Sequence, residues 1–208
     1  MQISSLTRAV IVASLLAPAL SVQPARASGD PIQGYWPKWR GPNQDGISRE
    51  TGWVVEGAAE PIWTAKVGIG YSAVAVSAGR VFTMGYDVDR SVDMVVCLNE
   101  ETGEEIWKHE YPAEIWNRGH DGGTLSTPTV DGDRVYTKNR EGKCFCFEAA
   151  TGKVLWYKDL LALYGPETGL WGFASAPLIV EDAVIVDAGI TLALDKATGD
   201  LLWKTRDY

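Results

Sequence analysis

The side chains best suited to binding a ligand occur mainly in two stretches of this 208-residue chain. Each is long for a connecting loop and rich in glycine and aromatic residues, and a short third stretch ends in a tyrosine. The candidate ligand-binding residues are Tyr71, Trp116, Arg118, His120, Asp121, Trp171 and Phe173. Aromatic rings stack on planar ligands and a guanidinium pairs with an anion in a bidentate manner, so this set predicts a site for a planar anionic ligand.

These stretches are residues 67–71, 111–124 and 160–174, and we expect them to lie at the mouth of one channel. A simpler interpretation, which the residue types favour, is that the loops pack on one another and on the segment from Trp36 to Asn43. The sequence leaves both interpretations open.

No other residue pattern in the sequence indicates a catalytic or metal site. The chain has no Gly-x-Ser-x-Gly element, and its two histidines, His109 and His120, are not at metal-ligand spacing. Asp87, Asp89 and Asp93 alternate along the chain, but we expect them to occupy a solvated turn between two strands. No metal site is therefore predicted, and the sequence identifies no catalytic residue.

The three cysteines indicate packing positions. Cys97 and Cys146 each precede a glycine by six residues, and Ala193 stands at the same distance from a third glycine. A position that accepts Cys, Cys and Ala predicts a small buried side chain. Cys144 and Cys146 lie two residues apart on one strand face, near the outer limit of disulfide geometry, so we expect them to stay reduced.

The elements that must position the loops come from an internal repeat. Three Thr-Gly-x-x-x-Trp motifs keep identical internal spacing, and a fourth tryptophan matches their last position. The residues predicted to be structural are Trp63, Trp107, Trp156, Trp203, Gly103, Gly152 and Gly199. The four tryptophans are 44, 49 and 47 residues apart, a period typical of propeller blades, which must stack on one another to bury their faces.

Each repeat divides into four short strands bounded by turn residues. The predicted strands are 73–76, 81–84, 94–98 and 105–108, then 127–130, 134–138, 144–147 and 154–157, then 176–180, 183–188, 191–194 and 201–204. The predicted fold class is all-β, a β-propeller of four-stranded antiparallel blades. It is incomplete, with about three blades and an orphan outer strand at Trp63.

The repeat resembles the tryptophan-docking motif Ala-x-Asp-x-x-Thr-Gly-x-x-x-Trp of quinoprotein-type, or PQQ-binding-like, propellers. Ala193, Asp195, Thr198, Gly199 and Trp203 match that motif in full. The two earlier repeats carry Cys in place of Ala, with Asn or Glu in place of Asp. The resemblance covers residues 62–208 and implies that each tryptophan docks on a neighbouring blade.

The same repeat occurs in quinone-dependent dehydrogenases and in non-catalytic propellers such as the outer-membrane assembly factor of the BamB type. The dehydrogenases resemble one another in an adjacent Cys-Cys pair, a calcium site and a catalytic Asp, whereas Cys144 and Cys146 are separated by Phe145. The resemblance therefore favours a non-enzymatic binding or scaffold module of the cell envelope with no identifiable cofactor. The alternative is a PQQ-dependent oxidoreductase with calcium, whose remaining cofactor residues lie in further blades.

The N-terminal segment predicts export. Residues 1–8 carry one positive charge and no acid, residues 9–22 are apolar, and Ala25-Arg26-Ala27 has the small-x-small pattern of a cleavage site. We expect a signal peptide over residues 1–27 and a periplasmic or secreted product without a further membrane span. Residues 28–61 form a Pro-, Gly- and Trp-rich extension, similar from Trp36 to Gly46 to the opening of many exported propeller repeat proteins. We expect the extension to cover a propeller face or an open edge, and residues 62–208 to form the blades.

Charge and blade count bear on the partners. The chain has 19 Lys and Arg against 27 Asp and Glu, a net charge of −8, and so lacks the basic footprint of a nucleic-acid-binding protein. The expected partners are envelope proteins or a small ligand. Propellers have about 4 to 8 blades, so we also expect further blades in a longer chain, or self-association.

Overall fold

The computed structural model describes residues 34–52, 60–117, 119–165 and 171–205. The chain divides into two compact units, Met1–Asp30 and Pro31–Tyr208, and every described residue belongs to the second unit. The predicted signal peptide and Arg118 lie outside the described residues. Within the described part, no helix has the length and apolar character needed to cross a membrane.

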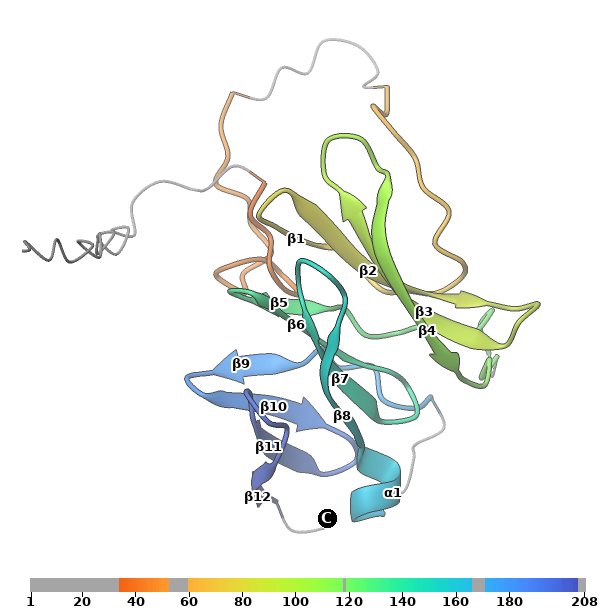
Figure 1. The fold of residues 1–208 in the computed structure, drawn as a ribbon, viewed down its shortest axis with the longest axis vertical. Coiled ribbons are helices and arrows are strands. Elements are labelled where there is room, and N and C mark those ends of the chain that lie inside the picture. Colours follow the sequence, from red (N-terminus) through yellow and green to blue (C-terminus); the bar gives the residue numbers. More distant parts are fainter. Residues whose placement is uncertain (1–33, 53–59, 118, 166–170, 206–208) are drawn as a thin grey trace, which may run out of the picture. The chain divides into compact units, whose positions relative to one another are not determined.

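The described residues form three four-stranded antiparallel sheets, one for each repeat (Figure 1). The first blade contains β1 (Ala75–Ser77), β2 (Arg80–Asp87), β3 (Val92–Asn99) and β4 (Glu105–Pro112). The second contains β5 (Thr129–Asp131), β6 (Arg134–Lys138), β7 (Lys143–Glu148) and β8 (Val154–Asp159). The third contains β9 (Leu178–Val180), β10 (Ala183–Asp187), β11 (Thr191–Asp195) and β12 (Leu201–Lys204). The predicted all-β fold with antiparallel four-stranded blades is confirmed.

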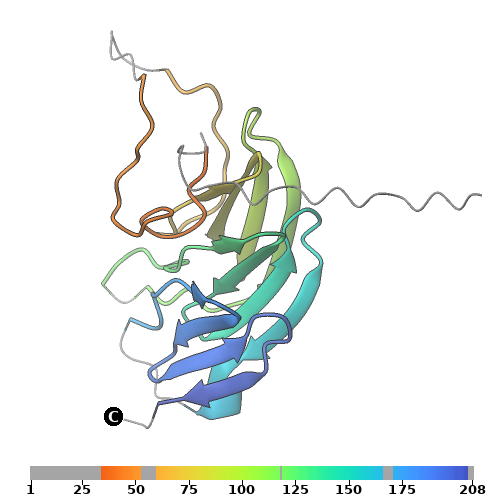
Figure 2. The ribbon, with the colours of Figure 1, turned by 90° about the vertical axis from the view of Figure 1, so that its left-hand side faces the viewer.

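Strand order places all the long loops at one end of the blades. Each sheet runs from its first strand to its fourth without a crossover, and the first strands β1, β5 and β9 are neighbours from blade to blade (Figure 2). Because neighbouring strands are antiparallel, the connections β4 to β5 and β8 to β9 leave from the same end as the β2–β3 and β6–β7 turns. We call this the loop end.

The third and fourth strands of every blade share a bulge at one repeat position. The facing pairs there are Cys97 with Trp107, Cys146 with Trp156, and Ala193 with Trp203, and the register shifts directly after each pair. Both cysteines and the alanine are fully buried, which confirms the prediction of a small buried residue. All three cysteines of the chain are free thiols.

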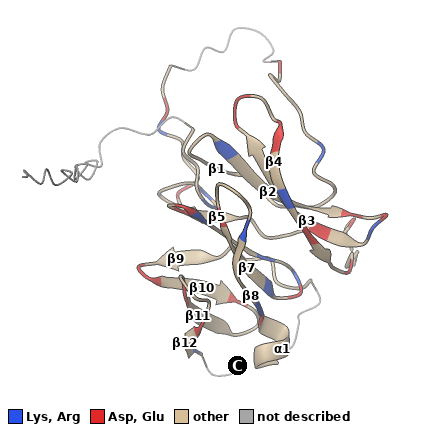
Figure 3. Ribbon diagram, in the orientation of Figure 1, with Lys and Arg blue, Asp and Glu red and all other residues tan. Residues whose placement is uncertain are grey.

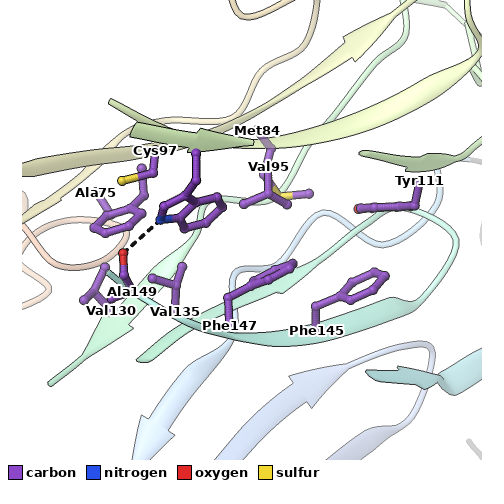
Figure 4. Packing of buried hydrophobic residues seen from close by; sticks show 12 residues of the cluster. Ala75, Met84, Val95, Cys97, Tyr111, Val130, Val135, Phe145, Phe147 and Ala149 are labelled. Atoms are coloured by element: carbon purple, nitrogen blue, oxygen red, sulfur yellow. Dashed lines mark hydrogen bonds between the residues drawn. The ribbon is translucent and has the colours of Figure 1, made fainter. Parts of the chain in front are cut away.

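Apolar side chains between adjacent blades form the core. Phe82, Val95 and Trp107 of the first blade share a cluster with Val135 and Phe147 of the second (Figure 4). The rings of Trp107 and Phe147 lie 5.7 Å apart. A second cluster joins the second blade to the third in the same way. Adjacent sheets therefore bury the apolar faces that they turn toward each other, as stacked blades must.

Three indoles make one repeated contact with the glycine turn of the following repeat. The pairs are Trp63 over Gly103, Trp107 over Gly152 and Trp156 over Gly199, and the indole N–H groups donate to the carbonyls of Glu100, Ala149 and Lys196 over 2.9, 2.9 and 3.1 Å. These glycines have φ between 72° and 74°, and a Cβ on any of them would lie 2.5–2.8 Å from the ring. Glycine thus provides both the left-handed turn and the room for the indole.

Two expectations about the first blade are corrected by the structure. Residues 60–68 contain no strand, although Trp63 makes the repeated indole contact, because no described strand pairs with this segment. Asp93 lies in β3 and is fully buried, so the alternating acids do not share a solvated turn. The β2–β3 hairpin extends further than predicted because Ile69 pairs with Tyr86 and Arg140 of the second blade pairs with Asp93.

The N-terminal extension makes backbone contacts with the first strands of two blades. Trp36 forms an antiparallel bridge with Val76, with two hydrogen bonds of 2.8 Å, and the Pro37 carbonyl accepts a hydrogen bond of 2.7 Å from the Val130 N–H. Both contacts use first strands, so the extension satisfies backbone groups that would otherwise remain unpaired.

Candidate functional site

Aromatic side chains from three loops meet at the loop end. The ring centroids of Tyr71 and His120 lie 5.4 Å apart in an edge-on arrangement, and those of His120 and Trp171 lie 5.7 Å apart, nearly parallel at 25°. Tyr71 and Trp171 remain 56% and 52% exposed. We call these three residues the aromatic row.

Backbone contacts between the loops hold the aromatic row in place. Gly70 and Thr124 form a parallel bridge, and the Tyr71 N–H donates to the Thr124 carbonyl over 2.6 Å. Gly119 has φ 79°, and a Cβ there would lie 2.7 Å from the Trp171 ring. The loop between β4 and β5 is therefore fitted closely against Trp171, with glycine required at the contact.

One hydrogen bond determines the protonation pattern of His120. Its Nδ1 accepts the Gly122 N–H over 2.9 Å, so in the neutral ring the proton is on Nε2. Asp121 is exposed, and its carboxylate has no ion-pair partner among the described residues. His120 therefore offers an N–H donor, and the next residue in the chain, Asp121, offers an exposed carboxylate acceptor.

Trp116 and Phe173 lie away from the aromatic row. Trp116 has φ 46°, an unusual conformation for a bulky residue, and its ring lies against Gly172. Phe173 is buried in the core between the second and third blades, and its N–H donates to the Arg140 carbonyl over 3.0 Å. Of the seven candidate residues, three form the row, Trp116 and Phe173 lie outside it, Asp121 is exposed and Arg118 is not described.

A shallow groove of about 530 Å³ borders Trp116. The end of β4, the β6–β7 turn and α1 (Leu160–Tyr164) line it, and Glu141 and Lys143 form an ion pair of 2.7 Å on its wall. The helix α1 is a single turn with Asp159 as its N-cap and Gly165 as its C-cap. Trp116 connects the groove to the loop that carries the row, because its ring lies against Gly172, the neighbour of Trp171 in the chain.

Sequence reasoning missed a layer of buried charge beneath the loops. Arg140 donates to Asp93 across the two blades over 2.8 Å with both side chains fully buried, and the Asn139 amide donates to the same carboxylate over 3.0 Å. The guanidinium lies over the Tyr86 ring at 5.1 Å. Burial raises the pKa of Asp93, and the charge and hydrogen bond of Arg140 oppose that rise.

Lys138 is a second buried cation. Its Nζ donates to the Ser175 hydroxyl over 2.9 Å and to the Asp187 carbonyl, and lies 5.4 Å from the Phe173 ring. Burial lowers the pKa of Lys138 to about 8, while Cys144 and Asp187 act in the opposite direction. Lys138 ends the predicted strand 134–138, and that strand pattern gives no signal that the cation is buried.

Neither histidine forms a catalytic pair with a nucleophile in the described structure. His109 packs against Phe147 at 5.1 Å, and burial lowers its pKa. The described residues contain no group of three or more His, Cys, Asp or Glu side chains placed to hold a metal ion. Basic and acidic residues occur on all three blades (Figure 3).

Comparison with known proteins gives a consistent group of relatives. Residues 93–208 match the family described as outer membrane protein assembly factor BamB. The chain is 27% identical over 116 residues to the outer membrane protein assembly factor BamB of Burkholderia pseudomallei, covering 53% of this chain and 27% of that protein. It is 30% identical over 89 residues to the quinoprotein alcohol dehydrogenase PedH of Pseudomonas putida, covering 43% of this chain and 14% of that protein.

The fold is shared with a solved dehydrogenase. A europium-containing methanol dehydrogenase superposes with a TM-score of 0.53 at 18% identity, over 69% of this chain and 26% of that protein. At this identity the likeness shows the fold alone. The chain spans less than a third of the length of each of these relatives.

Proposed function

The chain belongs to the family described as outer membrane protein assembly factor BamB, and on that premise we propose that it is an exported, non-enzymatic propeller that binds a partner through its loop end. The partner is an envelope protein or a small ligand. The proposal includes the candidate residues at the loop end as the contact surface, with the blades as a scaffold.

The aromatic row carries this proposal. Three loops separated by about one repeat each bring their rings into contact, Tyr71 and Trp171 are more than half exposed, and a backbone hydrogen bond joins the first two loops. The fully buried ion pair of Arg140 with Asp93, by contrast, lies between two blades. Exposed, preformed aromatic surface favours binding, and buried ion pairs favour a structural role.

Photocrosslinking tests which end of the blades binds. A photoreactive amino acid in place of Tyr71 is expected to capture an envelope component in cells. The same substitution at Ala78, an exposed residue of the β1–β2 turn at the opposite end, is the matched control. Adducts at position 78 with none at position 71 would contradict the proposal.

Export is tested separately. After expression in a Gram-negative host, the periplasmic or extracellular fraction is expected to contain a chain that begins at Ser28, because Ala25-Arg26-Ala27 supports cleavage after Ala27. A cytoplasmic chain that keeps Met1 would reject this part of the proposal.

A quinoprotein oxidoreductase is the second candidate, favoured by the 30% identity to PedH over 89 residues. The described residues do not fit the quinone with calcium, because Cys144 and Cys146 are buried, free and not adjacent, and no metal-holding group is found among those residues. Reconstitution with the quinone and calcium, followed by dye-linked oxidation of alcohols and sugars, separates the two candidates. Sustained turnover would reject the non-enzymatic function.

A further inference from the structure

The aromatic row offers one accessible indole to a ligand. Trp171 and Tyr71 each expose more than half of their surface, although large apolar side chains are usually buried. His120 stacks with Trp171 at 25°, and Tyr71 is edge-on to His120 at 87°, so the row has no common plane and Trp171 supplies its exposed flat face. That face is suited to the flat face of a ring-shaped ligand.

The geometry of the row exists without a ligand. The Tyr71 N–H is bonded to Thr124, the His120 ring is bonded to Gly122, and Trp171 lies against Gly119. The Tyr71 bond joins the segments before β5 and β1, and the close approach of Gly119 places the indole of the loop before β9 beside them. A ligand therefore does not have to order the rings, which reduces the entropic cost of binding.

The polar groups at the border distinguish between classes of ligand. His120 offers an Nε2–H donor, and the exposed Asp121 carboxylate accepts strong hydrogen bonds from hydroxyl groups. The described cations around the β6–β7 connection do not serve the row, because Lys138 and Arg140 are fully buried and Lys143 pairs with Glu141.

From this arrangement we propose that the aromatic row binds a neutral pyranose unit of a carbohydrate. The apolar C–H face of the sugar stacks on Trp171, and its hydroxyls donate to Asp121 and accept from His120. This inference specifies the ligand of the proposed function and rests on the loop end being the binding end.

Two other ligand classes fit the row less well. An anionic planar ligand would meet the Asp121 carboxylate in a chain of net charge −8. A quaternary ammonium ion is recognised by aromatic cages that surround it, whereas these rings form an open row.

Affinity electrophoresis of the purified chain tests the proposal. Native gels containing hydroxyethyl cellulose, dextran or glycol chitin, all neutral pyranose polymers, are compared with gels that contain no polymer. At least one polymer is expected to retard the chain. Trp171→Ala is expected to weaken binding about tenfold, or ~1.4 kcal/mol, Trp171→Tyr to weaken it less, and Asp121→Asn to weaken it while leaving the stacking surface intact.

Trp39→Ala is the matched control, since Trp39 is 56% exposed but belongs to the N-terminal extension. Thermal melting of each variant separates loss of binding from loss of fold. The proposal is overturned if no polymer retards the chain, if folded Trp171→Ala and Trp171→Tyr are retarded like the parent, or if Trp39→Ala removes the retardation. It is also overturned if only pyrroloquinoline quinone or choline perturbs Trp171 fluorescence.

Failure of the sugar-binding proposal can be distinguished from failure of the proposed function. Retardation by a polymer together with quinone-dependent turnover would reject the non-enzymatic function and leave the sugar-binding row in place. Crosslinks at position 71 without any retardation would reject the sugar and leave the binding end.

Discussion

Asp93 and Arg140 form a buried ion pair between the first and second blades, and the two residues differ in how they tolerate its loss. A carboxyl group left alone can take up a proton, and burial already raises the pKa of Asp93. A guanidinium cannot release its proton in a protein. We therefore predict that Asp93→Leu costs about 3–5 kcal/mol of unfolding free energy, and that Arg140→Met costs clearly less.

Urea denaturation of both variants and of the double variant measures this asymmetry. The double variant is expected to be more stable than Asp93→Leu, because it no longer buries an unpaired charge. Equal losses for the two single variants would show that the pair acts through packing alone, and Arg49→Met, at an exposed ion pair with Asp45, supplies the control.

Lys138 gives the fold a predictable response to pH. Its pKa of about 8 in the folded chain is below the ~10.4 of an unfolded lysine, so at neutral pH the folded state holds a buried charge. Between these two values the unfolded chain binds more protons, and the contribution of Lys138 to stability rises with pH. The free energy of unfolding of the parent minus that of Lys138→Met should increase by up to about 3 kcal/mol between pH 7 and 10.5. A difference that stays constant with pH would contradict this shift.

At the scale of the element, the tryptophan of the last strand stabilises the contact between one blade and the next. Trp156 is 7% exposed, lies against Gly199 and donates to the Lys196 carbonyl, so it fills a slot between the second and third blades. Trp156→Ala is expected to cost about 3–5 kcal/mol, as for other buried large aromatic residues. Chemical denaturation with Trp39→Ala as the exposed control measures the effect. A Trp156→Ala chain that unfolds within a few tenths of a kcal/mol of the parent would refute the docking role.

The sequence predicted correctly those strand ends that are determined by turn residues next to them in the chain. The prediction of β6 as Arg134–Lys138 and of β12 as Leu201–Lys204 is confirmed at both ends, because turn residues bound each strand. The β2 strand was predicted as 81–84 but ends at Asp87, where a neighbouring segment and the next blade hold its polar end. The one-turn helix α1 was missed because its Asp159 cap and Gly165 cap enclose too few residues for a helical period.

The sequence predicted which loops form the candidate site, but not the contacts between their side chains. The repeat placed Tyr71, His120 and Trp171 in segments that enter successive first strands, but their ring contacts depend on how those loops bond to one another. Phe173 was expected beside them and is buried in the core instead. Its ring lies near the Lys138 ammonium and its N–H donates to the Arg140 carbonyl, two long-range contacts that no sequence pattern indicates.

At the scale of the whole molecule, the outer face of the third blade is the least covered apolar surface in the described structure. Trp203 is 50% exposed, whereas its repeat equivalents Trp107 and Trp156 are 8% and 7% exposed, and all four residues of β12 are exposed. In the two preceding repeats a glycine turn and a carbonyl acceptor cover the indole. Either another blade or a second copy of the chain is therefore expected to cover Trp203.

The purified chain is accordingly predicted to self-associate or to bind a hydrophobic dye. Its net charge of −8 opposes association over long distances, but it does not remove the apolar contact between two β12 faces. Size-exclusion chromatography with light scattering should give a mass above that of the monomer, and Trp203→Ser should lower both the mass and the dye signal. The same change at Trp39 should leave them unchanged, because that residue lies in the extension. A compact parent monomer without dye binding would show that this face is stable in water, and that the third blade needs no further partner.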